Sequence, residues 1–292
     1  MAIADGHDDL AERADRVMEA PGFDAAVATY AETMTRFRLH GPPMINKLLG
    51  QDVRFRCVTF TLFLHHDALE GRPDGGATYS RLLELISGTM GGSQRVVSTT
   101  LALMQAMDFV RVEPAPLDRR VKFYRPTETM YAVVRAWLAN LFVSLDHIEP
   151  EAARVAQLEG GGDIVRRFIL GVGREFRAGE ILTGRMPEFA LFFDREGGWP
   201  LLALAIRAGL GGPAIPSRGE MAKMFKLSKT QIASVVGDAI AAGFMVDQGR
   251  DGLVTTALML ERYRRWLAIS FAFFLEATRL PDGAEPALLP AS

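Results

Sequence analysis

The chain has 292 residues, of which 49% are apolar and 23% are charged, and its formal net charge is −2. These values are ordinary for a globular protein, and the length suits two domains because single cores usually stop growing near this size. Cys57 is the only cysteine, which excludes a disulfide framework and a thiolate metal site within one chain. The sequence shows neither a secretory signal nor an apolar stretch long enough to span a bilayer, so we expect a cytoplasmic protein that does not enter the membrane.

The first part of the chain predicts a polar lead-in followed by two helices. Residues 1–21 are polar and acidic and predict a flexible segment. Apolar residues then recur at helical spacing over 23–39, and a second helical stretch covers 54–66. Adjacent histidines on a helix point about 100° apart and seldom share a metal ion. We therefore expect His65 and His66 to mark a solvent-facing helix end.

Residues 78–127 follow a different pattern, and we call them the first reading unit. The pattern predicts, in order, a helix over 78–86, a turn over 87–92, a helix over 93–107, strands over 109–112 and 121–124 around a loop over 113–120, and then a long helix over 127–148. The hydroxyl of Ser93 is well placed to cap the second helix, because it can accept a hydrogen bond from a free amide of the first turn. This order is that of a winged helix-turn-helix, in which the hairpin loop is the wing.

The same plan occurs a second time. Residues 135–142 (RAWLANLF) recur 129 residues later as 264–271 (RRWLAISF), and residues 93–110 match 228–245 at a constant offset of 135. The second copy predicts helices over 164–182, 199–207, 217–225 and 228–242, strands over 244–247 and 253–255 around a short wing, and a closing helix over 256–280. A repeat of this length predicts two copies of one domain. The expected boundaries are a first winged-helix unit over 22–159, a linker over 160–163, a second unit over 164–280 with its reading unit at 215–256, and a flexible tail over 281–292.

Charge is concentrated in the two reading units. Residues 75–127 and 215–265 each carry an excess of three positive charges, which leaves −8 for the rest of the chain. A local positive excess favours contact with nucleic acid.

Residues 79–130 resemble the MarR family of bacterial winged-helix regulators. The resemblance is carried by Ser93, by Met-Asp-Phe-Val over 107–110, by Asp-Arg-Arg-Val-Lys over 118–122 and by Pro-Thr-Glu over 126–128. Asp-Arg-Arg at this spacing is its most specific part. Asp108 stands where the family usually has glycine.

Other departures from the family pattern lie at Pro126 and in the second copy. Pro126 replaces a leucine that is usual in the family, and the second copy keeps Ser228 and Gly243 but lacks Asp-Arg-Arg. Most members of the family carry one copy and act as dimers through their first and last helices.

The resemblance implies a mainly α protein with small β-wings (α+β), built as tandem winged helix-turn-helix domains in an intrachain pseudo-dimer. The helices implied for its two-fold contact are 23–39, 128–148, 164–182 and 256–280. The implied function is a DNA-binding transcriptional regulator that uses two non-identical winged helices on double-stranded DNA, without a cofactor. The resemblance also allows a small aromatic effector between the flanking helices and the reading units, and it leaves open whether the pseudo-dimer stands alone or forms a homodimer.

Exposed polar and basic side chains of the second helix and wing of each copy are the candidate DNA contacts, because arginine pairs with guanine edges and phosphates and short polar groups reach base edges. In the first copy they are Ser93, Gln94, Arg95, Ser98, Thr99, Arg119, Arg120 and Lys122. In the second copy they are Ser228, Lys229, Thr230, Gln231, Ser234 and Arg250. Two different sets of contacts suit a non-palindromic site.

Other interpretations of the same residues remain open. A tandem winged-helix scaffold that mediates protein–protein contacts, without catalysis, is the alternative function. The two wing arginines can instead form ion pairs with Glu113 or Asp118. Trp137 and Trp266, at matching positions, predict packing rather than a ligand role. No catalytic arrangement and no metal-binding spacing stand out, so we expect no enzyme activity and no metal site.

Overall fold

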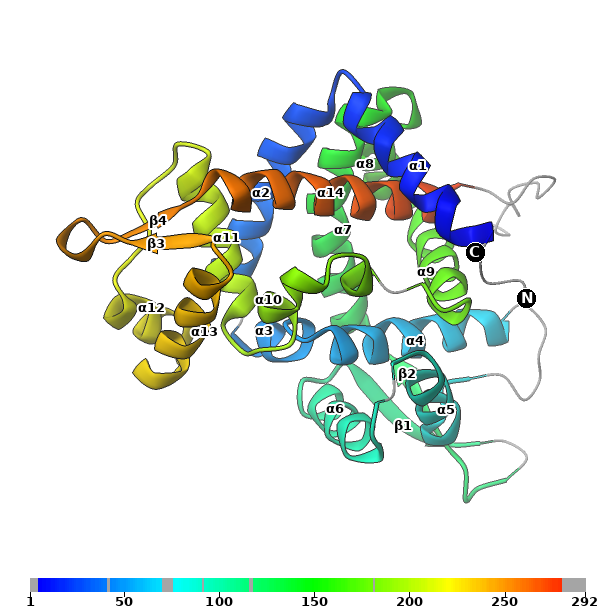
Figure 1. Ribbon diagram of the computed structural model, residues 1–292. Coiled ribbons are helices and arrows are strands. Elements are labelled where there is room, and N and C mark those ends of the chain that lie inside the picture. The colour runs from blue at the N-terminus through cyan, green and yellow to red at the C-terminus, as the bar shows by residue number, and fades with distance from the viewer. Residues whose placement is uncertain are drawn as a thin grey trace.

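The computed structural model describes residues 5–40, 43–69, 76–90, 92–115, 118–180 and 182–279, and it is mainly helical with two small antiparallel sheets (Figure 1). In chain order its elements are α1 (Asp5–Glu19), α2 (Phe23–His40), α3 (Pro43–Leu49), α4 (Asp52–Leu69), α5 (Tyr79–Met90), α6 (Gln94–Ala106), β1 (Val110–Pro114), β2 (Lys122–Pro126), α7 (Glu128–Ile148), η1 (Pro150–Ala152), α8 (Arg154–Glu159), α9 (Ile164–Arg177), η2 (Leu182–Arg185), η3 (Pro187–Phe189), α10 (Ala190–Phe193), α11 (Gly198–Gly209), α12 (Arg218–Phe225), α13 (Lys229–Ala241), β3 (Met245–Asp247), η4 (Gly249–Asp251), β4 (Leu253–Thr255) and α14 (Ala257–Thr278). Each sheet is a two-stranded hairpin, β1 with β2 and β3 with β4.

The long helices form one body. α2 packs on α7, and α9 packs on both α4 and α14. The rings of Trp137, Phe168 and Phe274 meet where α7, α9 and α14 converge, with centroids 5.7 to 5.8 Å apart. α2 with α7 and α9 with α14 therefore form two packed pairs, and the three rings connect one pair to the other. These are the four helices that the resemblance implies for the two-fold contact. The α5–α6–β1–β2 unit projects from the bottom of this body in Figure 1, and the α12–α13–β3–β4 unit projects from its left.

The two projecting units share their helix caps. Ser93 Oγ accepts a hydrogen bond from the Val96 amide at the start of α6, and Ser228 Oγ accepts one from the Gln231 amide at the start of α13. Thr127 and Thr256 cap α7 and α14 in the same way. The predicted cap at Ser93 is confirmed, because its hydroxyl satisfies an amide that has no partner inside the helix.

The units also share the turn that follows the second helix. Asp108 has a φ of +54° and Gly243, at the matching position, has a φ of +76°. Each is followed by a phenylalanine whose amide bonds back into the helix, at 2.8 Å for Phe109 and 2.9 Å for Phe244. The turn requires the left-handed conformation, in which glycine is unstrained and aspartate is tolerated. The repeat seen in the sequence is therefore also a repeat of backbone geometry.

The prediction of a flexible lead-in over 1–21 is wrong for most of that segment. Residues 5–19 form α1, which packs along α14. Leu10, Ala14 and Val17 are buried, and their spacing of four and three residues places them on one face of the helix. Arg13 also forms an ion pair with Glu276 of α14, at 3.2 Å. The polar and acidic residues that suggested a flexible segment therefore lie on the exposed side of an amphipathic helix.

Other boundaries differ from the expected ones. α5 continues to Met90, through the segment predicted as a turn, and α3 and α8 were not predicted. α9 ends at Arg177 rather than at 182, because Gly179 adopts a φ of +97° and the Glu180 amide bonds back to the Glu175 carbonyl, a common way to terminate a helix. The predicted tail over 281–292 lies outside the described residues.

Candidate nucleic-acid interface

The exposed face of α6 carries the polar side chains that the sequence analysis selected. Val97, Leu101 and Met104 are at most 2% exposed and anchor the opposite face. All five selected residues of this helix and its cap are exposed, namely Ser93, Gln94, Arg95, Ser98 and Thr99. The hydroxyls of Ser98 and Thr99 donate to the Arg95 carbonyl, which leaves their oxygen lone pairs free to accept hydrogen bonds. The helix therefore presents a continuous polar strip.

The β1–β2 hairpin, whose first strand packs against this helix, carries three exposed cations at and beside its loop. Arg119, Arg120 and Lys122 are exposed, and none forms an ion pair with another described residue. Asp118 Oδ1 accepts from the Arg120 amide at 2.9 Å, and Glu113 instead pairs with Arg125. In the structure, neither candidate acid neutralises the two wing arginines.

On the corresponding face of α13, more of the selected side chains already form hydrogen bonds within the protein. Ser228, Lys229, Thr230, Gln231 and Ser234 are all exposed. Gln231 Oε1 nevertheless accepts from the Ser228 amide at 2.9 Å as part of the helix cap. Ser234 accepts from Arg195 at 3.1 Å, and the same arginine pairs with Asp238. Ser228 Oγ takes part in the same cap, so three of the five side chains are engaged within the protein.

The two hairpins differ in charge. Arg250, exposed in η4, is the only selected basic residue of the second hairpin, and Asp251 follows it directly. The first hairpin carries three selected cations and also Arg111, an exposed β1 residue that the sequence analysis did not select. The alternation of exposed and inward positions along β1 was the signal that would have found it. The hairpin of the first unit therefore carries more exposed cations than the hairpin of the second.

Comparison with known protein families, with curated proteins and with solved structures found no match for the chain. None of the helices in the described part combines the length and the apolar character that crossing a membrane requires.

His65 and His66 lie near the end of α4, as predicted, but the prediction that they face solvent is wrong. Both are half-buried, and His66 Nε2 lies 2.9 Å from Tyr131 Oη of α7. Among the described residues no three histidine, cysteine, aspartate or glutamate side chains gather as a metal site would require. Burial lowers the pKa of His66 to about 4. The nearby positive charges of His65 and Arg166 lower it as well, and the negative charge of Asp163 partly opposes the shift.

This lowered pKa predicts a loss of stability in acid. The unfolded chain takes up the His66 proton near pH 6.5, whereas the folded chain resists it until about pH 4. Between these values the unfolded state binds more protons, so the free energy of unfolding falls as the pH falls. We expect a shallower fall for His66→Gln, which cannot titrate but keeps a polar group toward Tyr131. Urea denaturation from pH 4 to 7 measures it, and equal pH profiles for the two proteins would show that another group titrates.

Proposed function

We propose that the chain is a DNA-binding transcriptional regulator of the MarR type, in which two non-identical winged helices, α5–β2 and α12–β4, lie in one chain. The observation that carries the proposal is the exposed polar face of α6 together with the exposed cations of the β1–β2 hairpin, which form no ion pair with described residues. A helix with such a face can enter the major groove and contact base edges. Cations on an adjacent hairpin then contact phosphate, which supplies affinity without sequence information.

The unequal charge of the two hairpins supports different roles for the two units. Arg119, Arg120 and Lys122 are three exposed selected cations of the first hairpin, and Arg250 is the only selected cation of the second. On the second unit Gln231 and Ser234 are engaged in intramolecular hydrogen bonds. We infer that the first unit supplies most of the phosphate contact. The alternative function as a protein-contact scaffold is favoured only for the second unit, whose α13 face is partly engaged in hydrogen bonds within the protein.

We expect purified protein to bind random-sequence duplex DNA with an affinity that falls steeply as salt rises. Each phosphate contact contributes about 0.9 to the slope of log K against log salt. The double variant Arg119→Ala/Arg120→Ala should therefore reduce that slope by about 1.8 and weaken binding about tenfold or more at low salt. Both side chains are exposed, so folding should be unaffected. Fluorescence anisotropy across a salt series measures both quantities.

Two matched double variants show whether position matters as well as charge. Arg16→Ala/Arg36→Ala removes the same charge from exposed sites on α1 and α2, where both arginines pair with glutamate, and should leave the slope nearly unchanged. Lys229→Ala/Arg250→Ala should have a smaller effect than the β1–β2 variant. Absence of wild-type binding at low salt would refute the proposed function and favour the protein-contact scaffold.

A further inference from the structure

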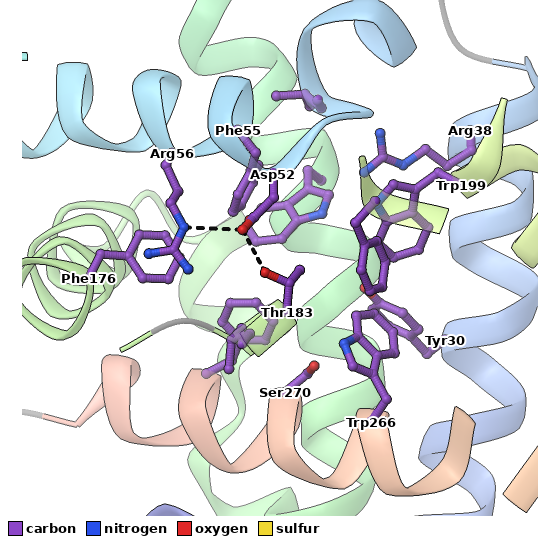
Figure 2. A pocket seen from close by; sticks show the side chains of 15 residues that line it. Tyr30, Arg38, Asp52, Phe55, Arg56, Phe176, Thr183, Trp199, Trp266 and Ser270 are labelled. Atoms are coloured by element: carbon purple, nitrogen blue, oxygen red, sulfur yellow. Dashed lines mark hydrogen bonds and ion pairs between the residues drawn. The ribbon is translucent and has the colours of Figure 1, made fainter. Parts of the chain in front are cut away.

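The inner surfaces of the two halves of the chain are buried against each other. α2 and α4 belong to the first half and α14 to the second, and Figure 2 shows their side chains meeting. Trp137 and Trp266 are packed there, as the sequence predicts, with aromatic ring centroids 5.3 to 5.8 Å away. The cavity left between the side chains measures only about 70 Å³. A second chain therefore has no access to this surface.

Arginines at the wall of this cavity lie at the junction of the two halves. Arg56 Nε lies 3.4 Å from Asp52, which accepts from Thr183 of the second half at 2.8 Å (Figure 2). Arg38 is 5% exposed, and its Nε and Nη1 have no hydrogen-bond partner among the described residues. Burial lowers the pKa of Arg38 to about 10, which leaves the side chain charged at neutral pH. Because this junction is closed, contacts with another protein must use the outer surface of the chain.

Exposed apolar side chains are concentrated in the second half of that outer surface. The described part of the chain has eight large apolar side chains that are exposed, and five of them lie between residues 210 and 258. They are Leu210, Met224, Val246, Val254 and Leu258. Single exposed apolar residues are normal, whereas a contiguous group marks a contact with another molecule.

Two valines of the β3–β4 hairpin form a contiguous pair. Val246 and Val254 lie directly opposite each other in the hairpin register. Their neighbours Met245 and Leu253 are buried, so the alternation of side chains along a strand directs both valines to the outer face. They are 47% and 40% exposed, and Figure 1 shows their hairpin at the left edge of the molecule, with its loop directed away from the other elements. The hairpin thus presents a small apolar face to the solvent.

The first hairpin carries cations at the same two positions. Arg111 and Arg125 are the opposite residues that correspond to Val246 and Val254. Each pair begins three residues after the left-handed turn and ends two residues before the threonine that caps the next helix. One backbone arrangement therefore carries arginines in the first unit and valines in the second. Valines contribute nothing to contact with phosphate, but they favour contact with an apolar protein surface.

We propose that the β3–β4 hairpin joins two copies of this chain, with the valine faces of the two hairpins packed against each other about a two-fold axis. In such a contact each surface meets its own copy, so the surface must be complementary to itself. An apolar centre meets this condition. The proposal concerns self-association and does not require the chain to bind DNA.

The charges of the hairpin loop favour a second copy over a partner of one charge sign. Arg250 and Asp251 are adjacent and exposed, and neither forms an ion pair with another described residue. A two-fold contact can bring Arg250 of each copy to Asp251 of the other, whereas DNA or a strongly charged protein would be repelled by one of them. The contact is small, because each strand has three residues. We therefore expect a weak dimer with a dissociation constant of about 10–100 µM.

We expect sedimentation of the full-length protein without DNA to show a reversible monomer–dimer equilibrium between about 1 and 300 µM. Val246→Arg/Val254→Arg should weaken the dimer about tenfold or more, because like charges replace an apolar contact. The variant should fold normally, since the first hairpin carries arginines at the same positions. Val121→Arg/Val143→Arg changes two similarly exposed valines, at 39% and 37%, outside the second unit. This control should dimerise like the wild type.

Reversal of one loop charge tests the two-fold pairing directly. Arg250→Asp leaves two acidic residues in the loop and Asp251→Arg leaves two basic ones, so each variant alone should dimerise more weakly than the wild type at low salt. An equimolar mixture of the two should restore association, because the acidic loop of one variant meets the basic loop of the other. Such a rescue requires contact between two chains and cannot arise from altered folding.

Three results would each overturn the proposal. The first is a wild-type protein that stays monomeric at about 300 µM, and the second is dimerisation of Val246→Arg/Val254→Arg as strong as that of the wild type. The third is a mixture of the loop variants that associates no better than either alone. Since no DNA is present, these results leave the proposed function intact, and absence of DNA binding leaves the proposed dimer intact.

Discussion

Replacing Asp146 by alanine is expected to lower the free energy of unfolding by about 3 kcal/mol or more. Asp146 lies near the end of α7 and accepts hydrogen bonds from the backbone amides of Arg154 and Val155, both at 3.0 Å. It also lies 3.4 Å from Arg154 Nη1. Arg154 is 3% exposed. The substitution therefore removes both the cap of α8 and a counter-ion of a buried guanidinium.

The expected loss is large because Arg154 joins three helices. Besides Asp146, it pairs with Glu149 and donates to Thr278 Oγ1 of α14 at 3.1 Å. Guanidinium denaturation measures the change, as a shift of the midpoint at constant slope. Glu32→Ala, which breaks an exposed pair with Arg36, should cost less than about 0.5 kcal/mol. Equal losses for the two variants would show that the Arg154 network does not stabilise the fold.

Gly171→Ala is expected to destabilise the protein by about 2 kcal/mol. A Cβ atom at this position would lie 2.3 Å from the carbonyl oxygen of Ala277 and 2.7 Å from its Cα. These are backbone atoms of α14, so relief requires the two helices to move apart. Alanine favours a helix over glycine by up to about 1 kcal/mol, which only partly offsets the clash.

Gly88→Ala is the matched control for this substitution. Gly88 also lies within a helix, α5, but a Cβ atom there would meet nothing within 4 Å. We expect this variant to gain about 0.5–1 kcal/mol from helix propensity alone. Chemical denaturation compares the two, and a gain in stability for both would contradict the close crossing of α9 and α14. Gly173, where a Cβ would lie 2.2 Å from the Phe63 ring, predicts a similar loss where α9 crosses α4.

Features determined by neighbouring residues could be predicted from the sequence. The Ser93 cap and the Thr127 start of α7 depend on a side chain and an amide three residues away, and both are present. The helix–helix–hairpin order of each unit follows from the spacing of apolar residues within short windows. The Ser228–Gln231 pair also matched the capping-box spacing. That signal would have removed Gln231 from the candidate DNA contacts.

Features that depend on distant contacts could not be predicted in this way. Arginine is mostly exposed in proteins, and nothing near Arg38 or Arg56 in the sequence shows that they lie at the wall of a cavity. α1 was mistaken for a flexible segment because its apolar face is narrow and its partner, α14, lies more than 200 residues away. The spacing of Leu10, Ala14 and Val17 was visible, but its significance depends on that partner.

The internal repeat has a consequence for the buried charge of Arg38. In a symmetric pair of identical chains every buried cation occurs twice, so the cost of an uncompensated buried charge is incurred twice. Here the repeated units belong to one chain, so each substitution occurs once per molecule. Because the two halves belong to one chain, a buried arginine in one half does not require a second one in the other half. The interior of the protein can therefore be asymmetric, which a dimer of identical chains does not allow.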